Sequence, residues 1–179
     1  MIAADYPQEI LNMNEFVIAD SGIRQLHARF VDAVWRKDAD AFADCFAEDG
    51  EWKIAGLHMR GRAEIGGQIG NLLSSCERVQ LILGLPILEV EQDTATGRMQ
   101  VTELAKLTDG SSAMTFGIYY DRYVREGERW RFQWRHWTLH YRGPTDLSAA
   151  LVDGPDYGPH PGMPAPDEPT IVRKPPADQ

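Results

Sequence analysis

The residues best suited to proton transfer lie on two aromatic-rich segments late in the chain. Tyr119, Asp121 and Tyr123 alternate with other residues along the first segment, and Trp134 and His136 alternate along the second. Successive side chains of a strand point to opposite faces, so residues two apart share a face. A histidine titrates near neutral pH, and a carboxyl group in apolar surroundings can stay protonated, so this set could accept and return a proton.

The two segments, 113–125 and 129–141, predict an antiparallel hairpin closed by a two-residue loop at Gly127-Glu128. This register places three pairs of side chains opposite one another on one face: Tyr119 with His136, Asp121 with Trp134, and Tyr123 with Phe132. The opposite face of the second strand would then carry Arg131, Gln133 and Arg135, which suits solvent or a subunit contact.

Glu103 is a further acidic candidate, on a predicted strand over 98–107. A two-residue turn at Asp109-Gly110 would place Glu103 on the face opposite to Asp121. A three-residue loop would place both carboxyl groups on the same face, because a shift of one residue turns every side chain over. The sequence leaves both arrangements open.

Each candidate also has a structural interpretation. Asp121 could form an ion pair with Arg135 or Arg122, and His136 could be a neutral core histidine bonded to Tyr119. Glu103 could point outward, and the two tyrosines could serve packing alone. A solvated loop position is an alternative for His58, which precedes Arg60-Gly61 and could otherwise reach a ligand at the mouth of a pocket.

The elements that would position these residues segregate along the chain. Helical spacing of apolar residues predicts a helix capped by Ser21, a short helix capped by Asp38 or Asp40, and a third helix beginning at Gly61. Residues 51–55 alternate as a short strand, and from Val79 onward the pattern is β, with a break near Gly84 and Pro86. This order predicts an α+β fold in which helices cover the mouth of a strongly bent antiparallel sheet, leaving a cone-shaped small-molecule pocket.

The ends of the chain differ from this central part. Nine of the 11 prolines lie between Pro144 and Pro176, so residues 143–179 predict an acidic, Pro-rich arm that is extended or disordered, and residues 1–20 an N-terminal extension. Of the formal net charge of −9, each end carries −4, so the predicted domain over 21–142 carries only −1. A nearly neutral domain in an acidic chain argues against nucleic-acid binding and favours an uncharged, hydrophobic ligand.

Other function classes find little support in the sequence. It contains no HxH or HExxH spacing and no Gly-rich phosphate loop, so neither a metal nor a cofactor is expected. No apolar run is long enough to span a bilayer, so no membrane association is expected. The two cysteines form no CxxC motif, and no basic residue precedes Arg24, so a cytoplasmic location is expected.

Two stretches of the chain resemble SnoaL-like proteins of the nuclear-transport-factor-2-like superfamily. The first runs from Ile23-x-x-Leu26 through Phe46-Ala47-Glu48-Asp49-Gly50-Glu51-Trp52 to Gly61-Arg62-x-x-Ile65, and the second contains Tyr120-Asp121-Arg122 and Arg129-Trp130-Arg131-Phe132. The resemblance covers about residues 21–142. It implies the cone-shaped fold, chemistry without a cofactor, and a homo-oligomer formed through the outer sheet face.

The resemblance also locates familiar catalytic positions. The His–Asp pair of the dehydratase and dehydrochlorinase relatives falls on Leu81 and Trp35, and the tyrosine and base of the steroid isomerases fall on Phe30 and Ile54. All four residues here are apolar or aromatic. The strand aspartate of the isomerases and cyclases falls on Asp121. Epoxide-hydrolase relatives carry two carboxylates, whose positions fall on Glu103 and His136.

We therefore expect a cofactor-independent acid/base enzyme of the isomerase, dehydratase, cyclase or hydrolase type, acting on a hydrophobic, cyclic small molecule. His136 would be the base, with Asp121 and Glu103 as acids or charge partners and Tyr119 as a hydrogen-bond donor. The remaining predicted ligand contacts are Trp134, Tyr123, Phe30, Ile54, Trp52, Leu81 and His58. The alternative is a non-catalytic binding or structural module, which the apolar residues at the familiar catalytic positions favour.

Overall fold

The computed structural model describes residues 8–151, with side chains described from Met13 onward. Three helices come mainly before the strands, as expected for the predicted α+β fold. The elements in chain order are α1 (Gln8–Arg36), α2 (Ala39–Ala43), β1 (Phe46–Ile54), β2 (Leu57–Arg60), α3 (Arg62–Ser74), β3 (Cys76–Leu83), β4 (Ile87–Glu91), β5 (Thr94–Leu107), β6 (Ser112–Glu126) and β7 (Arg129–Gly143).

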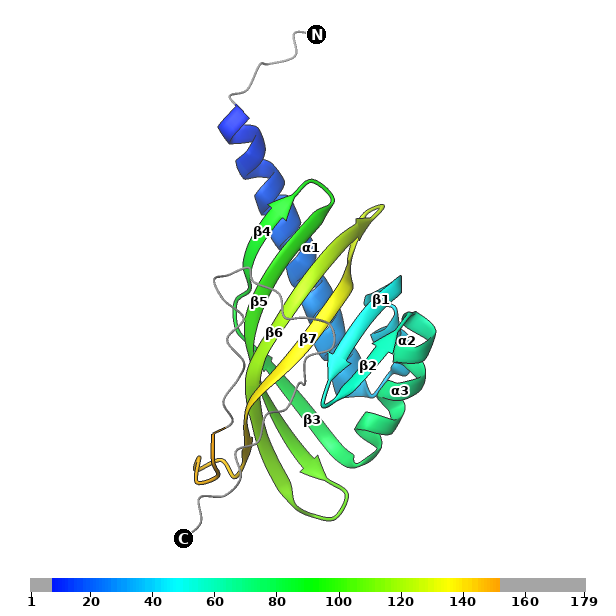
Figure 1. The fold of residues 1–179 in the computed structure, drawn as a ribbon, viewed down its shortest axis with the longest axis vertical. Helices are drawn as coiled ribbons and strands as arrows, with labels where there is room; N and C mark the ends of the chain where they lie inside the picture. Colours follow the sequence, from blue (N-terminus) through cyan, green and yellow to red (C-terminus); the bar gives the residue numbers. More distant parts are fainter. Residues whose placement is uncertain (1–7, 152–179) are drawn as a thin grey trace.

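The first helix, α1, begins well before the predicted cap at Ser21, so that prediction was wrong. No proline or glycine interrupts residues 8–21, so nothing in this segment stops a helix. Close packing explains the glycine at position 22 of this helix, because a Cβ atom there would lie 2.5 Å from the Trp130 ring. Its first turns extend past the tips of the neighbouring hairpins (Figure 1).

The two shorter helices, α2 and α3, begin at positions that the sequence predicts. The backbone N–H of Ala41 donates to the Asp38 carboxylate over 2.9 Å, so Asp38 caps α2 as predicted. Gly61 precedes α3 with a positive φ of 82°, a backbone conformation that glycine adopts without strain. Ile65 and Ile69 are the buried side chains of α3.

Seven strands form one curved sheet in the order β2-β1-β7-β6-β5-β3, with β4 paired to the edge of β5 (Figure 1). β1 runs parallel to β7, and the other pairings are antiparallel. The predicted break near Gly84 and Pro86 separates β3 from β4. β1 begins earlier than the predicted strand at 51–55, and its pairing with β7 is irregular between Phe46 and Glu51.

The hairpin of β6 and β7 departs from the predicted register partway along its length. Its tip is as expected, since Glu126 pairs with Arg129 and Tyr123 pairs with Phe132. A bulge at Gln133 then shifts the pairing by one residue, so that Asp121 lies opposite Arg135 and Tyr119 opposite Trp137. The prediction that Trp134 and His136 face the inside of the cone was therefore wrong, and Arg135 and Trp137 take those places.

The β5–β6 connection resolves the position of Glu103. The backbone N–H of Leu107 bonds to the carbonyl oxygen of Ser111, which leaves a loop of three residues between them. Glu103 consequently pairs with Thr115 and shares its face with Tyr119 and Asp121. The second of the two arrangements left open by the sequence is the one adopted.

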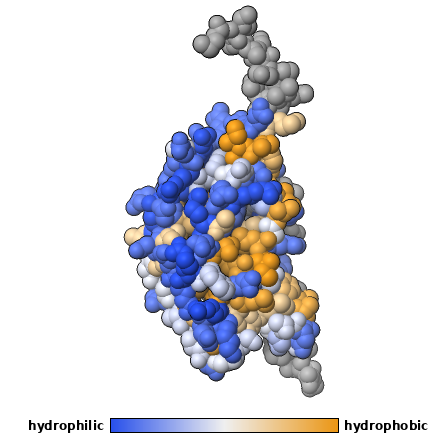
Figure 2. Space-filling view, turned by 180° about the vertical axis from the view of Figure 1, so that it is seen from behind, coloured by the Kyte–Doolittle hydropathy of each residue, from blue (hydrophilic) through white to orange (hydrophobic). Residues whose placement is uncertain are grey.

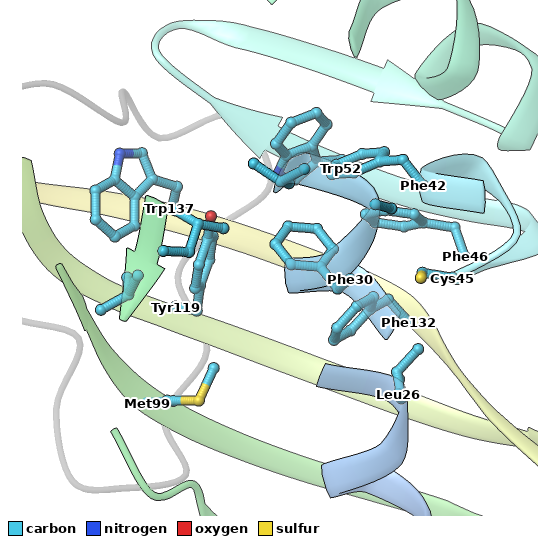
Figure 3. Packing of buried hydrophobic residues seen from close by; sticks show 14 of the residues in the cluster. Leu26, Phe30, Phe42, Cys45, Phe46, Trp52, Met99, Tyr119, Phe132 and Trp137 are labelled. Carbon is cyan, nitrogen blue, oxygen red and sulfur yellow. The ribbon is translucent and has the colours of Figure 1, made fainter. Parts of the chain in front are cut away.

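Aromatic side chains fill much of the space between α1, α2 and the concave face of the sheet. Phe30 of α1 lies at the centre, with ring centroids of Phe42, Phe132 and Tyr119 at 4.7, 5.6 and 6.1 Å (Figure 3). Among residues 8–151, no helix is long and apolar enough to cross a membrane.

Candidate functional site

A cavity of about 180 Å³ lies inside the cone, between the helices and the middle of the sheet. Its polar lining is sparse and comes largely from one row of paired residues that crosses the sheet, Leu81–Glu103–Thr115–Arg142. Most other lining side chains are apolar or aromatic: Phe30, Val34, Phe42, Trp52, Ile54, Ile69, Leu72, Leu73, Val79, Val101, Leu107, Leu139 and Trp137.

Glu103 is the acidic side chain that lines this cavity. It projects from the middle of β5 and is half-buried. Burial raises the pKa of Glu103 above its usual value, and the positive charge of Arg142 opposes this shift only in part. A carboxyl group held in this way can act as an acid when protonated and as a stronger base than usual when ionised.

Tyr119 and Trp52, which each carry a polar group, also line this cavity. Tyr119 lies on β6 against Trp137, with ring centroids 5.0 Å apart, and burial raises the pKa of its hydroxyl so that it stays protonated. Trp52 lies beside Phe42 in the same aromatic cluster, with ring centroids 5.0 Å apart (Figure 3). Its buried Nε1 has no hydrogen-bond partner among the described residues.

Behind the cavity, four side chains form a buried polar network. Arg135 donates from Nε and Nη2 to the two carboxylate oxygens of Asp121 over 2.7 and 2.8 Å. The hydroxyl of Tyr123 donates to Asp121 over 2.9 Å and lies 3.0 Å from Nε2 of His27. Asp121 therefore forms an ion pair with Arg135, which is the structural interpretation that the sequence offered for this residue.

Aromatic rings enclose the guanidinium of Arg135 on its remaining sides. Its carbon lies 3.7 Å from the ring centroid of Phe132, 3.9 Å from that of Tyr119 and 4.5 Å from that of Phe30. Cation–π contacts of this kind compensate part of the cost of burying the charge. Since Phe30 and Tyr119 also line the cavity, the network supports the cavity wall without itself lining it.

The predicted base, His136, lies on the other face of the sheet. It is fully buried there beside Trp134, with ring centroids 5.6 Å apart, and Lys53 of β1 is its partner in the register. Burial, together with the charges of Lys53 and His58, lowers the pKa of His136 to about 4. His136 and Trp134 are not among the described residues that line the cavity, because the bulge at Gln133 turned them away.

Of the other residues predicted to contact a ligand, some line the cavity and some do not. Phe30, Ile54, Trp52 and Leu81 line the cavity, whereas Tyr123 belongs to the buried network. His58 bonds to Glu51 over 2.5 Å on the β1–β2 hairpin.

Sequence reasoning missed Thr115, Arg142 and Trp137 as cavity residues. Thr115 and Arg142 carry no distinctive spacing. Thr115 follows once Glu103 is known to face inward, because the two residues are paired. Arg142 joins this row only through a second shift in the β6–β7 pairing, between Phe116 and Gly117. Within the part of the chain that the structure describes, no group of three or more His, Cys, Asp or Glu side chains is arranged to hold a metal ion.

Comparisons with known proteins agree with this architecture. A family model described as a SnoaL-like domain matches residues 17–136. The search of curated proteins found no significant match. A variant of the Mycobacterium tuberculosis protein Rv3472, whose function is unknown, has a similar structure with 26% identity and a TM-score of 0.66, covering 83% of each chain.

Two further solved structures share the fold at lower identity. A proposed scytalone dehydratase from Novosphingobium aromaticivorans DSM 12444 has 16% identity and a TM-score of 0.69, covering 78% of this chain and 94% of its own. The hexachlorocyclohexane dehydrochlorinase LinA-type3 from Novosphingobium barchaimii LL02 has 19% identity and a TM-score of 0.67, covering 79% and 98%. At these identities, the likeness shows the fold alone.

Proposed function

Since this chain belongs to the SnoaL-like domain family, we propose that it is a cofactor-independent acid/base enzyme that acts on a hydrophobic, cyclic small molecule. The family match and the structural neighbours support a role in processing small molecules. The observation that carries the finer proposal is Glu103, an acid with a raised pKa in an otherwise largely apolar cavity. Perturbed acids in enclosed pockets are frequent at catalytic sites.

The size and lining of the cavity support a ligand of about one ring. A cavity of about 150 Å³ lined by aliphatic and aromatic side chains can bind benzene, and this one measures about 180 Å³. The aromatic rings of Phe30, Trp52 and Trp137 offer flat apolar surfaces to such a ligand.

In the proposed reaction, ionised Glu103 takes a proton from a carbon next to a ligand carbonyl. The electrons of the broken C–H bond form a C=C bond, and the carbonyl electrons move to oxygen. The Tyr119 hydroxyl or the Trp52 N–H would donate a hydrogen bond to this oxyanion. Return of the proton from Glu103 to another carbon completes an isomerisation, and loss of a leaving group with its electron pair completes an elimination.

This proposal changes the roles expected from the sequence. Glu103 replaces His136 as the base, because His136 faces the other side of the sheet. Asp121 is proposed to position Arg135, and through it the ring of Tyr119, without exchanging a proton with the ligand. A cytoplasmic location and independence from metals remain predictions.

A non-catalytic binding module is the second candidate function. The observation that favours it is the apolar character of Leu81 and Trp35 at the positions of the His–Asp pair that the relatives use. Such a protein would bind the same class of ligand in the same cavity without turnover.

Hydrogen–deuterium exchange into a cyclic ketone distinguishes the two candidates. NMR would follow deuterium entering the carbons next to the carbonyl of cyclohexanone or 2-indanone in D₂O. We expect the protein to accelerate this exchange, and Glu103→Gln to lower the acceleration about 10²- to 10⁴-fold. Quenching of tryptophan fluorescence by the ketone should persist in the variant, because the ring-binding surface is unchanged.

The matched control is Glu89→Gln, which changes an exposed glutamate on β4 in the same way. It should exchange at the wild-type rate. Exchange no faster than without protein, with ketone binding retained, would reject the enzyme and favour the binding module. Equal acceleration by the wild type and Glu103→Gln would reject Glu103 as the base.

A further inference from the structure

One exposed face of α1 is apolar and unusually symmetric along the helix. Met13 and Val17 lie eleven and seven residues before Arg24, and Val31 and Trp35 lie seven and eleven residues after it. At about 100° per residue, all these side chains project within about 20° of Arg24 around the helix axis. Asp20 and Ala28, four residues on either side of Arg24, complete the same stripe.

The outer half of this stripe has no partner among the described residues. Met13 and Val17 of the stripe are 65% and 58% exposed, and Ala19 is the first buried side chain from Met13 onward. The neighbouring Phe16 and Ile18, which project from other faces of the helix, are 43% and 63% exposed. These turns extend beyond the sheet (Figure 1). An isolated helical segment of this length is marginal in water, so it needs a surface to pack against.

The inner half of the stripe borders a groove. Arg24, Ala28, Val31 and Trp35 form one wall, and Leu83 to Pro86, between β3 and β4, form the other. Trp35 and Leu85 are 53% and 75% exposed. The face of the molecule that carries α1 accordingly shows hydrophobic areas at the outer end of the helix and at the middle of the molecule, separated by polar surface (Figure 2).

From this arrangement we propose that a second copy of the chain docks on α1, with the two helices antiparallel about a twofold axis. Met13 and Val17 of each copy would then fill the groove beside Val31 and Trp35 of the other. The symmetric spacing about Arg24 makes the stripe self-complementary, which an isologous interface requires.

Charge complementarity at the centre supports the second copy as the occupant. Asp20 and Arg24 form an ion pair over 2.7 Å within one chain. In an antiparallel pair the two Arg24 residues meet near the twofold axis, and Asp20 of each copy lies about 6 Å further along its helix, within reach of Arg24 of the other, so two acids flank two bases between the apolar ends. The stripe from Met13 to Trp35 is about 33 Å long at 1.5 Å per residue, long enough for an extended helix–helix contact. We expect this dimer to form at about micromolar concentrations.

The sheet face is a less suitable place for this contact. The resemblance predicts an oligomer through the outer sheet face, but Trp134, His136 and Lys53 on that face are already buried in the single chain. The α1 stripe is instead open to solvent.

A charge-swap experiment tests the proposal. Sedimentation velocity on the full chain at about 1–100 μM, a range that spans the expected dissociation constant, would measure association of the wild type, Asp20→Arg and Arg24→Asp. Each variant alone places like charges at the centre, so its dissociation constant should rise about tenfold or more. An equimolar mixture should associate about as tightly as the wild type, because opposite charges meet again.

Val17→Asp should weaken the dimer by a similar factor, and its matched control is Leu57→Asp, at an exposed leucine on β2. Far-UV circular dichroism would check that all variants keep their helices. A monomeric wild type, or an oligomer unaffected by the single charge changes, would overturn the proposal, and so would a mixture that associates no better than its components.

Discussion

At the scale of single residues, two carboxyl groups of the site have separate roles. Asp121 is tied to Arg135 by two hydrogen bonds and is fully buried. Glu103 has no such partner in the described contacts and lines the cavity, with its pKa raised by burial. The structure therefore separates a carboxylate that stabilises the cavity wall from one that is placed to meet a ligand.

The ion pair of Asp121 and Arg135 should be strongly coupled. Removing one partner leaves a buried charge uncompensated, which costs about 3–5 kcal/mol of unfolding free energy. We therefore expect Asp121→Asn and Arg135→Met each to destabilise the protein by about this amount. The double variant should cost at least about 2 kcal/mol less than the two single changes together. Urea unfolding of the four proteins measures this coupling, and additive losses would contradict it.

At the scale of elements, the bulge at Gln133 decides which residues reach the cone. The residue pattern of β6 and β7 predicted the hairpin, its two-residue loop and the pairing at its tip correctly. The bulge was not predictable, because it depends on contacts with a strand distant in sequence. The side chain of Gln133 donates to Asp49 of β1 over 3.1 Å, and a Cβ atom on Gly50 would lie 2.8 Å from the carbonyl oxygen of Phe132.

Contacts between segments distant in sequence also explain why only some of the site residues could be found from the sequence. Apolar spacing and the resemblance correctly placed Phe30, Trp52, Ile54 and Leu81 at the pocket, since helix and strand periodicity fix the buried face. Glu103 remained ambiguous because its facing depended on one residue of loop length. The early start of α1 was missed because no described side chain before Ala19 is buried, so the apolar residues of its first turns do not continue the buried stripe of Ile23, Leu26 and Phe30.

A pair of deletions tests the role of the bulge. Deleting Gln133 removes the extra residue but keeps Asp121 opposite Arg135, so we expect a cost of only about 1–2 kcal/mol. Deleting His136 instead turns Trp137 and Leu139 out of the cone, which should cost more than about 4 kcal/mol. Thermal or urea unfolding compares the two, and equal losses would show that the bulge does not set the facing of β7.

At the scale of the whole molecule, the sheet buries neutral histidines on both of its faces. His27 lies inside the cone, where burial and the charge of Arg135 lower its pKa well below the usual value. His136 lies on the outer face with a pKa of about 4, against an ordinary value of 6.5. Folding therefore requires both rings to stay uncharged while the unfolded chain takes up protons.

This linkage predicts a loss of stability in mild acid. Below pH 6.5 the unfolded chain binds a proton at each histidine that the native protein does not, so the free energy of unfolding falls as the pH falls. For His136 the loss continues until the pH reaches about 4. At about 1.4 kcal/mol per pH unit, His136 alone should account for about 2 kcal/mol between pH 7.5 and pH 5. His136→Asn should remove that part of the decrease and leave the parts due to His27 and to His140, whose pKa burial also lowers. Urea unfolding at the two pH values measures these contributions, and a variant with the full wild-type decrease would show that His136 is protonated equally in the folded and unfolded states.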